Sequence, residues 1–190
     1  MTANDRKRQV QLGGEPLVLL PTRAGREFGY KVTSMSSGAQ RVEDGNQFSA
    51  SHIFEAVADN GTATVWIDTG ATTLGMTYDI SAGGDAYVRL RESVNMGTAV
   101  GTPLTAFNHN RNDSNTVDAT IYHSPTYTSG GTIIEEAFIA GGQKGFASGG
   151  GESADHSWII DIGHNYSVDV VNKGGGDKAI SIDINLYEDN

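Results

Sequence analysis

The chain contains no cysteine, and its 190 residues include only four prolines against 25 glycines. Without cysteine there can be no disulfide, no thiolate chemistry and no zinc site built on sulfur. Stability must therefore come from packing or from association between subunits. Many glycines with few prolines indicate a chain of tight turns and not a disordered, proline-rich chain.

Long apolar runs are also missing. No stretch of the sequence approaches the roughly 18 consecutive apolar residues that cross a membrane as a helix. The segment Met1–Val10 is polar and charged, which is not the pattern of a secretory signal. We therefore expect no membrane partner, and either a cytosolic protein or one that is released and assembled without a secretion pathway.

Basic residues are scarce and unevenly placed. The formal net charge is −10, but residues 1–46 hold seven basic and five acidic side chains, while the remainder holds six basic and eighteen acidic ones. The acidic remainder argues against nucleic acid as a partner, because phosphate binding needs clustered Lys and Arg. The basic N-terminal segment could lie on an acidic surface or could be a solvated tail.

Short runs of alternating apolar and polar residues recur from about Gln47 to Tyr187. In the last run the even-numbered residues from Ile180 to Leu186 are apolar and their neighbours are polar. Only a strand, whose side chains alternate between two faces, sorts residues in this way. Strands are predicted at Gln47–Val57 (a short helix is the alternative), Ala63–Asp68, Thr73–Ile80, Ala86–Arg91, Thr116–Tyr122, Ser157–Ile162, Tyr166–Val171 and Ala179–Tyr187.

Three of the runs carry further expectations. Ser157–Ile162 is nearly all apolar and predicts a central strand. In Ala63–Asp68, Val65 and Ile67 share one face and Trp66 lies on the other. Thr132–Ala140 fits a helical spacing as well as a strand, and we predict a strand because every neighbouring run is one.

The connections between these runs favour an antiparallel architecture. Ser81–Asp85 and Asn172–Asp177 are rich in glycine and have the lengths of hairpin loops. Parallel strands would need crossovers of about a dozen or more residues, usually helical, and few stretches allow them. The predicted fold class is all-β: an antiparallel two-layer β-sandwich, jelly-roll-like, with an extended N-terminal arm.

We place the domain boundary near Gln47. Residues 47–190 form the predicted sandwich, and residues 1–46 form an arm that consists of a docking segment and a linker. The apolar run Leu17–Leu20 lies between Pro16 and Pro21 and predicts a short strand or docking segment. Ser34–Asn46 is small, polar and glycine-containing, which is typical of a linker.

No motif for a metal or cofactor site is complete. The five histidines include no pair at the HxH or HxxxH spacing that places two imidazoles on one ion. Asn108–Asn115 is dense in side-chain amides and resembles the first half of a calcium loop, but it lacks the glycine turn and the closing glutamate. We expect Asx-turns there instead, in which Asn and Asp accept hydrogen bonds from the nearby backbone.

No motif for catalysis is complete either. The chain has no nucleophile elbow and no phosphate-binding glycine motif. Glu135 and Glu136 would alternate between faces of a strand, so they could not act together on one bond. For Trp66 and Trp158 we expect core packing, with a sugar-binding platform as the alternative. We predict a protein that is not an enzyme and that has no cofactor or metal.

Three segments together resemble a family of tailed-bacteriophage virion structural proteins. They are Leu74–Asp79, the strand Ala86–Glu92, and Phe107–Thr116, in which an Asn-Arg-rich turn precedes a Thr-rich strand and the Pro-Thr segment at Ser124–Thr126. Trp158–Ile160 and the final aromatic-acidic pair Tyr187-Glu188 are similar too. The family usually has a Lys-Pro-Asn-like turn before the penultimate strand, whereas this chain has Ile162-Gly163-His164-Asn165.

The resemblance, which covers roughly Thr73–Asp189, implies a virion structural protein, and we expect a capsid decoration (cement) protein. It would be made in the host cytoplasm, lie on the capsid surface and bridge subunits of the major capsid protein. It would form a homo-oligomer, expected to be a homotrimer. The alternative is a tail or fibre module that binds a host glycan through Asn108–Asn115 and Gly141–Gly151. The candidate partner-binding residues are Arg6, Lys7, Arg8, Leu17, Val18, Leu19, Leu20, Arg23 and Arg26.

Overall fold

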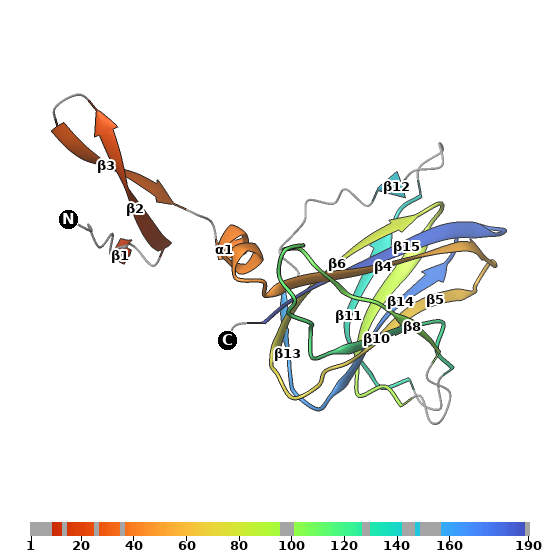
Figure 1. Cartoon of the computed structure of the whole chain (residues 1–190). Coiled ribbons are helices and arrows are strands. Elements are labelled where there is room, and N and C mark those ends of the chain that lie inside the picture. The colour runs from red at the N-terminus through yellow and green to blue at the C-terminus, as the bar shows by residue number, and fades with distance from the viewer. Residues whose placement is uncertain are drawn as a thin grey trace. The chain divides into compact units, whose positions relative to one another are not determined.

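The chain forms two compact units, Met1–Asp44 and Gly45–Asn190. The computed structural model (Figure 1) describes residues 9–12, 15–24, 27–34, 37–95, 101–126, 130–141, 147–148 and 157–188. The predicted boundary, Gln47, lies two residues into the second unit. No helix in these described ranges is long and apolar enough to cross a membrane.

The first unit is a small antiparallel sheet followed by a short helix. Its strands β1 (Gln9–Leu12), β2 (Glu15–Ala24) and β3 (Glu27–Ser34) pair in chain order. The boundary between the two units falls inside the predicted linker Ser34–Asn46, most of which is helical, as α1 (Ser37–Glu43). Its Ala, Gln, Arg and Glu residues are good helix formers. The helix is followed by Gly45 at a φ of +72°, a conformation common just after a helix.

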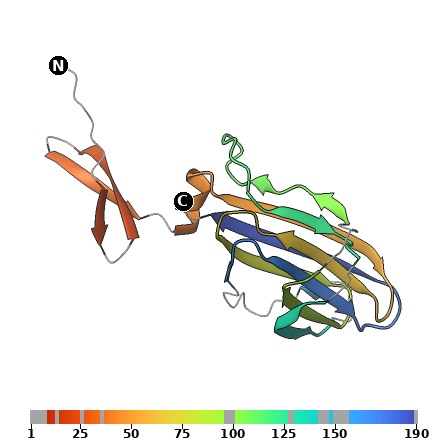
Figure 2. The ribbon, with the colours of Figure 1, turned by 90° about the horizontal axis from the view of Figure 1, so that it is seen from below.

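The second unit is a sandwich of two antiparallel sheets (Figures 1 and 2). One sheet has the order β11-β7-β14-β5-β10-β8, and the other has the order β12-β6-β15-β4-β9, with β13 also paired to β6. The strands are β4 (Gln47–Val57), β5 (Thr62–Asp68), β6 (Leu74–Ala82), β7 (Ala86–Glu92), β8 (Thr102–Leu104), β9 (Phe107–Asn108), β10 (Thr120–His123), β11 (Thr132–Ile139), β12 (Ala147–Ser148), β13 (Trp158–Ile160), β14 (Asn165–Asn172) and β15 (Lys178–Glu188).

The strand order is that of a jelly roll, as predicted. The chain moves from one sheet to the other at each step from β4 to β7 and again from β14 to β15. The last strand, β15, then inserts between β4 and β6, while β14 inserts between β5 and β7. Two such interlocked sheets are the double Greek-key arrangement of jelly rolls.

This order corrects one prediction about the loops. Ser81–Asp85 and Asn172–Asp177 are not hairpin loops, because each joins strands of different sheets. A glycine-rich connection of this length can either reverse a strand within its sheet or arch to the other sheet. The two arches lie against each other: a Cβ at Gly174 would be only 2.9 Å from the Cα of Gly84. Glycine is required at this close backbone approach.

The hydrophobic core lies between the two sheets and follows the predicted alternation. Ile180, Ile182, Ile184 and Leu186 of β15 are all fully buried. On β5, Val65 and Ile67 face this core, whereas Trp66 belongs to a separate cluster with Val94 and Tyr122. Trp158 is partly buried against the main core. A period of two predicts this pattern, in which alternate residues of a strand face the core and the residues between them face away from it.

Several strand predictions are confirmed and two need correction. Gln47–Val57 and Thr132–Ile139 are strands and not helices. The run Ser157–Ile162 is not a central strand: only Trp158–Ile160 is extended, it pairs with β6 alone, and Ile159 is 67% exposed. The longer β15 occupies the other side of β6. In the predicted strand Thr116–Tyr122, only the part from Thr120 onward is extended, as the start of β10, and the residues before Thr120 belong to the preceding loop.

Candidate binding surfaces

The predicted partner-binding residues belong to the first unit. Leu17, Val18, Leu19, Leu20 and Arg23 all lie on β2, the middle strand of its sheet. Arg6, Lys7, Arg8 and Arg26 lie outside the described residues. The structure therefore brings five of the nine candidates onto one strand.

The strand register divides these candidates between two faces. Residues directly opposite one another in an antiparallel pair share a face, and neighbours along a strand alternate. Leu19 is opposite Val32, and Leu20 is opposite Lys31. The positions on the face that contains Leu19, here called the Leu19 face, are Val10, Leu12, Glu15, Leu17, Leu19, Pro21, Arg23, Phe28, Tyr30, Val32 and Ser34.

Eight of these eleven positions are apolar. The opposite face is mixed, because the register places Gln9, Gln11, Thr22, Glu27, Lys31 and Thr33 on it together with Gly29, Pro16, Val18, Leu20 and Ala24. Sequence reasoning missed the contribution of β3, although Phe28, Tyr30 and Val32 alternate with polar residues or glycine in the manner of a strand. That alternation is the signal that could have found them.

In the second unit, the Asn-Arg turn is built from Asx-turns, as predicted. The backbone N–H groups of Asn110, Asn112 and Asn115 donate to the side-chain oxygens of Asn108, Asn110 and Asp113 at 2.8, 3.1 and 2.7 Å. Asn108 is buried, and its amide donates to the carbonyl oxygens of Gly45 at 2.9 Å and Asn115 at 3.2 Å. Most of these side-chain oxygens therefore hold the loop itself.

A shallow hollow of about 360 Å³ adjoins this loop. It is lined by Asn46, Ser114, Asn115, Thr116 and Glu188. Glu188 is largely buried and accepts a hydrogen bond from the backbone N–H of Asp118 at 2.9 Å. With one carboxylate already engaged and otherwise small polar side chains, the hollow provides little apolar surface for a ligand.

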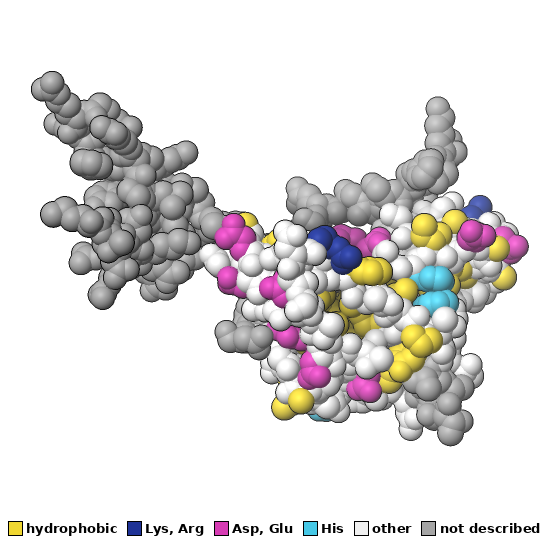
Figure 3. All heavy atoms as spheres, in the orientation of Figure 1, with side chains coloured by type: hydrophobic (Ala, Val, Ile, Leu, Met, Phe, Trp, Pro, Cys, Tyr) yellow, Lys and Arg dark blue, Asp and Glu magenta, His cyan; other side chains and the backbone are white. Residues whose placement is uncertain are grey.

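An exposed aromatic side chain precedes the same loop. Phe107 on β9 is 55% exposed, and the guanidinium of Arg111 lies 5.4 Å from the centre of its ring. This distance is within the range of a cation–π contact. Figure 3 shows basic and apolar side chains together on this face of the second unit, with histidines nearby. The Phe107 ring is thus partly open to solvent, with one cation beside it.

Two stacked histidines connect the two sheets at one edge of the sandwich. His52 of β4 and His123 of β10, which belong to different sheets, stack with ring centres 3.6 Å apart, and Phe54 lies 4.6 Å from His52. Burial, followed by the neighbouring His52, lowers the pKa of His123. Among the described residues, no three His, Asp or Glu side chains gather in a way that could hold a metal ion.

At the opposite edge, a carboxylate connects the two sheets through hydrogen bonds. Glu135 of β11 accepts hydrogen bonds from the Tyr78 hydroxyl at 2.8 Å and the Trp158 indole N–H at 3.1 Å. Burial and this hydrogen bond raise the pKa of Tyr78 above its usual range. Glu136 instead pairs with Arg89 at 2.7 Å. The two glutamates thus have separate partners, as the alternation predicted.

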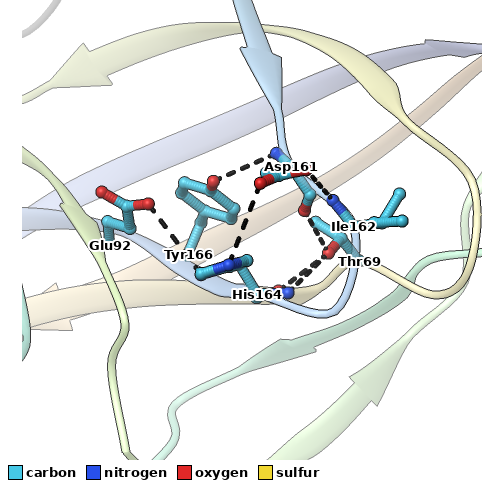
Figure 4. Close-up of polar contacts among 6 residues, drawn as sticks. All are labelled: Thr69, Glu92, Asp161, Ile162, His164 and Tyr166. Atoms are coloured by element: carbon cyan, nitrogen blue, oxygen red, sulfur yellow. Dashed lines mark hydrogen bonds and ion pairs between the residues drawn. The ribbon is translucent and has the colours of Figure 1, made fainter.

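The turn at Ile162-Gly163-His164-Asn165 is held by a buried threonine (Figure 4). The Thr69 hydroxyl lies 2.7 Å from the carbonyl oxygen of Asp161 and 2.9 Å from that of His164. The His164 ring is 3.9 Å from the carboxylates of both Glu92 and Asp161, which is too long for a hydrogen bond. The group organises a turn and lacks the aligned nucleophile and base of a hydrolytic site.

Comparison with known proteins finds no match to the chain among protein families, curated proteins or solved structures.

Proposed function

We propose that this protein is a structural protein of a tailed-bacteriophage virion, and specifically a capsid decoration (cement) protein. The observation that carries the proposal is the sequence resemblance, whose segments correspond to β6, β7, the Asn-Arg loop and the strands up to β15. Jelly rolls serve in viral capsids and in lectins, so the fold is compatible with this role but does not specify it.

The physical logic of the proposal is adhesion. A small sandwich that bridges neighbouring capsid subunits adds contact area where internal pressure strains the shell. The first unit carries a net charge of +2 and would bind an acidic surface of the major capsid protein. Three copies would assemble about a local three-fold axis of the shell.

Cosedimentation with expanded phage shells tests the proposal. We expect the full chain to pellet with the shells and a chain lacking residues 1–46 to stay in solution. A matched pair of variants separates charge placement from total charge: Arg6, Lys7 and Arg8 changed to Glu, against Lys144, Lys173 and Lys178 changed to Glu. The first should bind more weakly than the second. Equal binding by both, or labelling of tails and not heads in electron cryomicroscopy, would overturn the proposal.

Glycan binding is the second candidate, and the exposed Phe107–Arg111 pair favours it. The Asn-Arg loop weighs against it, because the side-chain oxygens of Asn108, Asn110 and Asp113 are engaged in Asx-turns. Most of the other predicted segment, Gly141–Gly151, lies outside the described residues. Phe107→Ala should abolish binding on a glycan array if this candidate holds. Phe138→Ala is the matched control, since Phe138 is also 55% exposed.

A further inference from the structure

A polar hollow adjoins the Asn-Arg loop, and we propose that it binds a calcium ion through the carboxylate of Glu188. The side chains that line the hollow all carry oxygen, as a carboxylate, an amide or a hydroxyl: Asn46, Ser114, Asn115, Thr116 and Glu188. Ca²⁺ takes about six to eight oxygen ligands, which include waters and backbone carbonyls. All five residues belong to the second unit, and the inference holds whether or not the protein decorates a capsid.

Glu188 is the residue of the hollow that points to a cation. It is only 8% exposed. One of its carboxylate oxygens accepts a hydrogen bond from the backbone N–H of Asp118 at 2.9 Å. In the part of the chain that the structure describes, no Lys, Arg or His pairs with this carboxylate. Buried charges in proteins are usually paired or coordinate a metal, because an unpaired charge loses its hydration. A cation in the hollow supplies the missing partner.

Strand pairing and one side-chain hydrogen bond bring the lining residues together from three segments. The backbone N–H of Glu188, the last residue of β15, donates to the carbonyl oxygen of Asn46 at 3.0 Å. The buried Asn108 amide holds the carbonyl oxygen of Asn115 at 3.2 Å. Figure 2 shows the end of β15, the start of β4 and the Asn-Arg loop at the same end of the sandwich. Backbone that is fixed before binding loses little freedom when an ion binds. Because these segments are far apart in sequence, no local motif reveals the site.

The chemistry of the side chains favours Ca²⁺ over other ions. None of them offers the nitrogen or sulfur ligands that Zn²⁺ and Cu²⁺ prefer. Mg²⁺ needs near-ideal octahedral geometry and gives up its waters reluctantly, whereas Ca²⁺ accepts irregular sets of oxygens. The site also differs from one built on three His, Asp or Glu side chains, which the described residues lack. With one carboxylate among neutral oxygens, it should bind weakly, with a Kd of about 10⁻⁴ to 10⁻³ M.

NMR titration of the full chain with CaCl₂ tests the site, because it detects weak binding and locates it. We expect saturable shifts of the amide signals around the hollow, and Glu188→Gln should weaken binding at least about tenfold. Glu136→Gln removes the same charge from a surface glutamate that pairs with Arg89, and it should bind as the wild type does. No saturable shifts in the wild type, or equal binding by the two variants, would overturn the proposal.

A gain of affinity gives a second test that does not need Glu188→Gln to fold. Asn115→Asp adds a second carboxylate to the hollow and should tighten Ca²⁺ binding about tenfold, since affinity rises with the number of charged ligands. Asn112→Asp makes the same change in the same loop at an exposed residue that does not line the hollow. It should leave the affinity near that of the wild type. Equal affinities for the two variants would overturn the proposal.

Mg²⁺ separates a bound ion from general screening of charge. Residues 47–190 hold six basic and eighteen acidic side chains, so any divalent cation reduces their mutual repulsion. At equal concentrations, CaCl₂ should raise the melting temperature of the wild type more than MgCl₂ does, and Glu188→Gln should abolish the difference. Equal effects of the two salts on the wild type would show screening only and would overturn the proposal.

Discussion

Of two buried hydroxyl groups on neighbouring strands, one has a hydrogen-bond partner and the other has none among the described residues. The Thr64 hydroxyl donates to the carboxylate of Asp169 at 2.9 Å, and Asp169 also pairs with Arg91 at 2.7 Å. The Ser167 hydroxyl is fully buried and has no hydrogen-bond partner among the described residues. A buried polar group without a partner costs free energy that a paired one recovers.

We therefore expect Ser167→Ala to be neutral or to raise the free energy of unfolding by about 1 kcal/mol. Thr64→Val, which keeps the shape of the side chain, should lower it by about 1 to 3 kcal/mol because it leaves a buried carboxylate with one fewer donor. Urea unfolding followed by tryptophan fluorescence measures both. A larger loss for Ser167→Ala than for Thr64→Val would contradict this account.

The histidine stack gives a dependence on pH. The pKa of His123 is lowered from its usual 6.5, first by burial and then by His52, so the unfolded chain binds this proton more readily than the folded one. Stability from this group is therefore complete above about pH 6.5 and is lost as the pH falls from there towards the lower pKa of the folded state. His123→Phe should make the melting temperature fall less steeply across this window. Parallel curves for the two proteins would argue against the prediction.

At the scale of elements, the Asn-Arg loop shows how far local chemistry can be read from sequence. Its Asx-turns are predictable because Asn and Asp hydrogen-bond backbone groups two residues away, whatever the rest of the fold does. The loop's anchoring to Gly45 through Asn108 is not predictable, since those residues meet only after β4 and β9 have paired.

Asn108→Ala removes both donated hydrogen bonds and the oxygen that caps Asn110. We expect it to lower the free energy of unfolding by about 2 to 3 kcal/mol. Asn112→Ala, in an exposed side chain of the same loop, should change it by less than about 0.5 kcal/mol. Chemical denaturation compares the two, and equal losses would show that Asn108 is not the anchor.

The N-terminal unit shows which features of an element the sequence does not reveal. The flanking prolines mark Leu17–Leu20 as a short apolar strand, but by themselves they do not reveal its partner, the run Phe28, Tyr30, Val32. With β3 included, the segment becomes a sheet with two different faces. The helix α1 resembles a linker in sequence because it is short and begins with serine and glycine, which precede its helix formers.

At the scale of the whole molecule, the two sheets are joined along their edges by different side chains. Glu135 links β11 of one sheet to Tyr78 and Trp158 of the other. Glu135→Ala leaves two partly buried donors unpaired and should cost about 2 to 3 kcal/mol. Glu136→Ala, one residue away, breaks only a surface pair with Arg89 and should cost about 1 kcal/mol or less. Thermal unfolding of both variants tests the difference, and similar melting temperatures would contradict it.

The period of two in runs such as Ala179–Tyr187 is enough to establish strands, their buried faces and an antiparallel β-sandwich. These features depend on neighbouring residues along the chain, which a pattern can report. Whether Ser81–Asp85 turns back or arches to the other sheet, whether Ser157–Ile162 is central, and which sheet receives each strand depend on which strands compete for the same edge. That competition is resolved only when β14 and β15 insert between strands far from them in the chain, so it leaves no mark on any local stretch of residues.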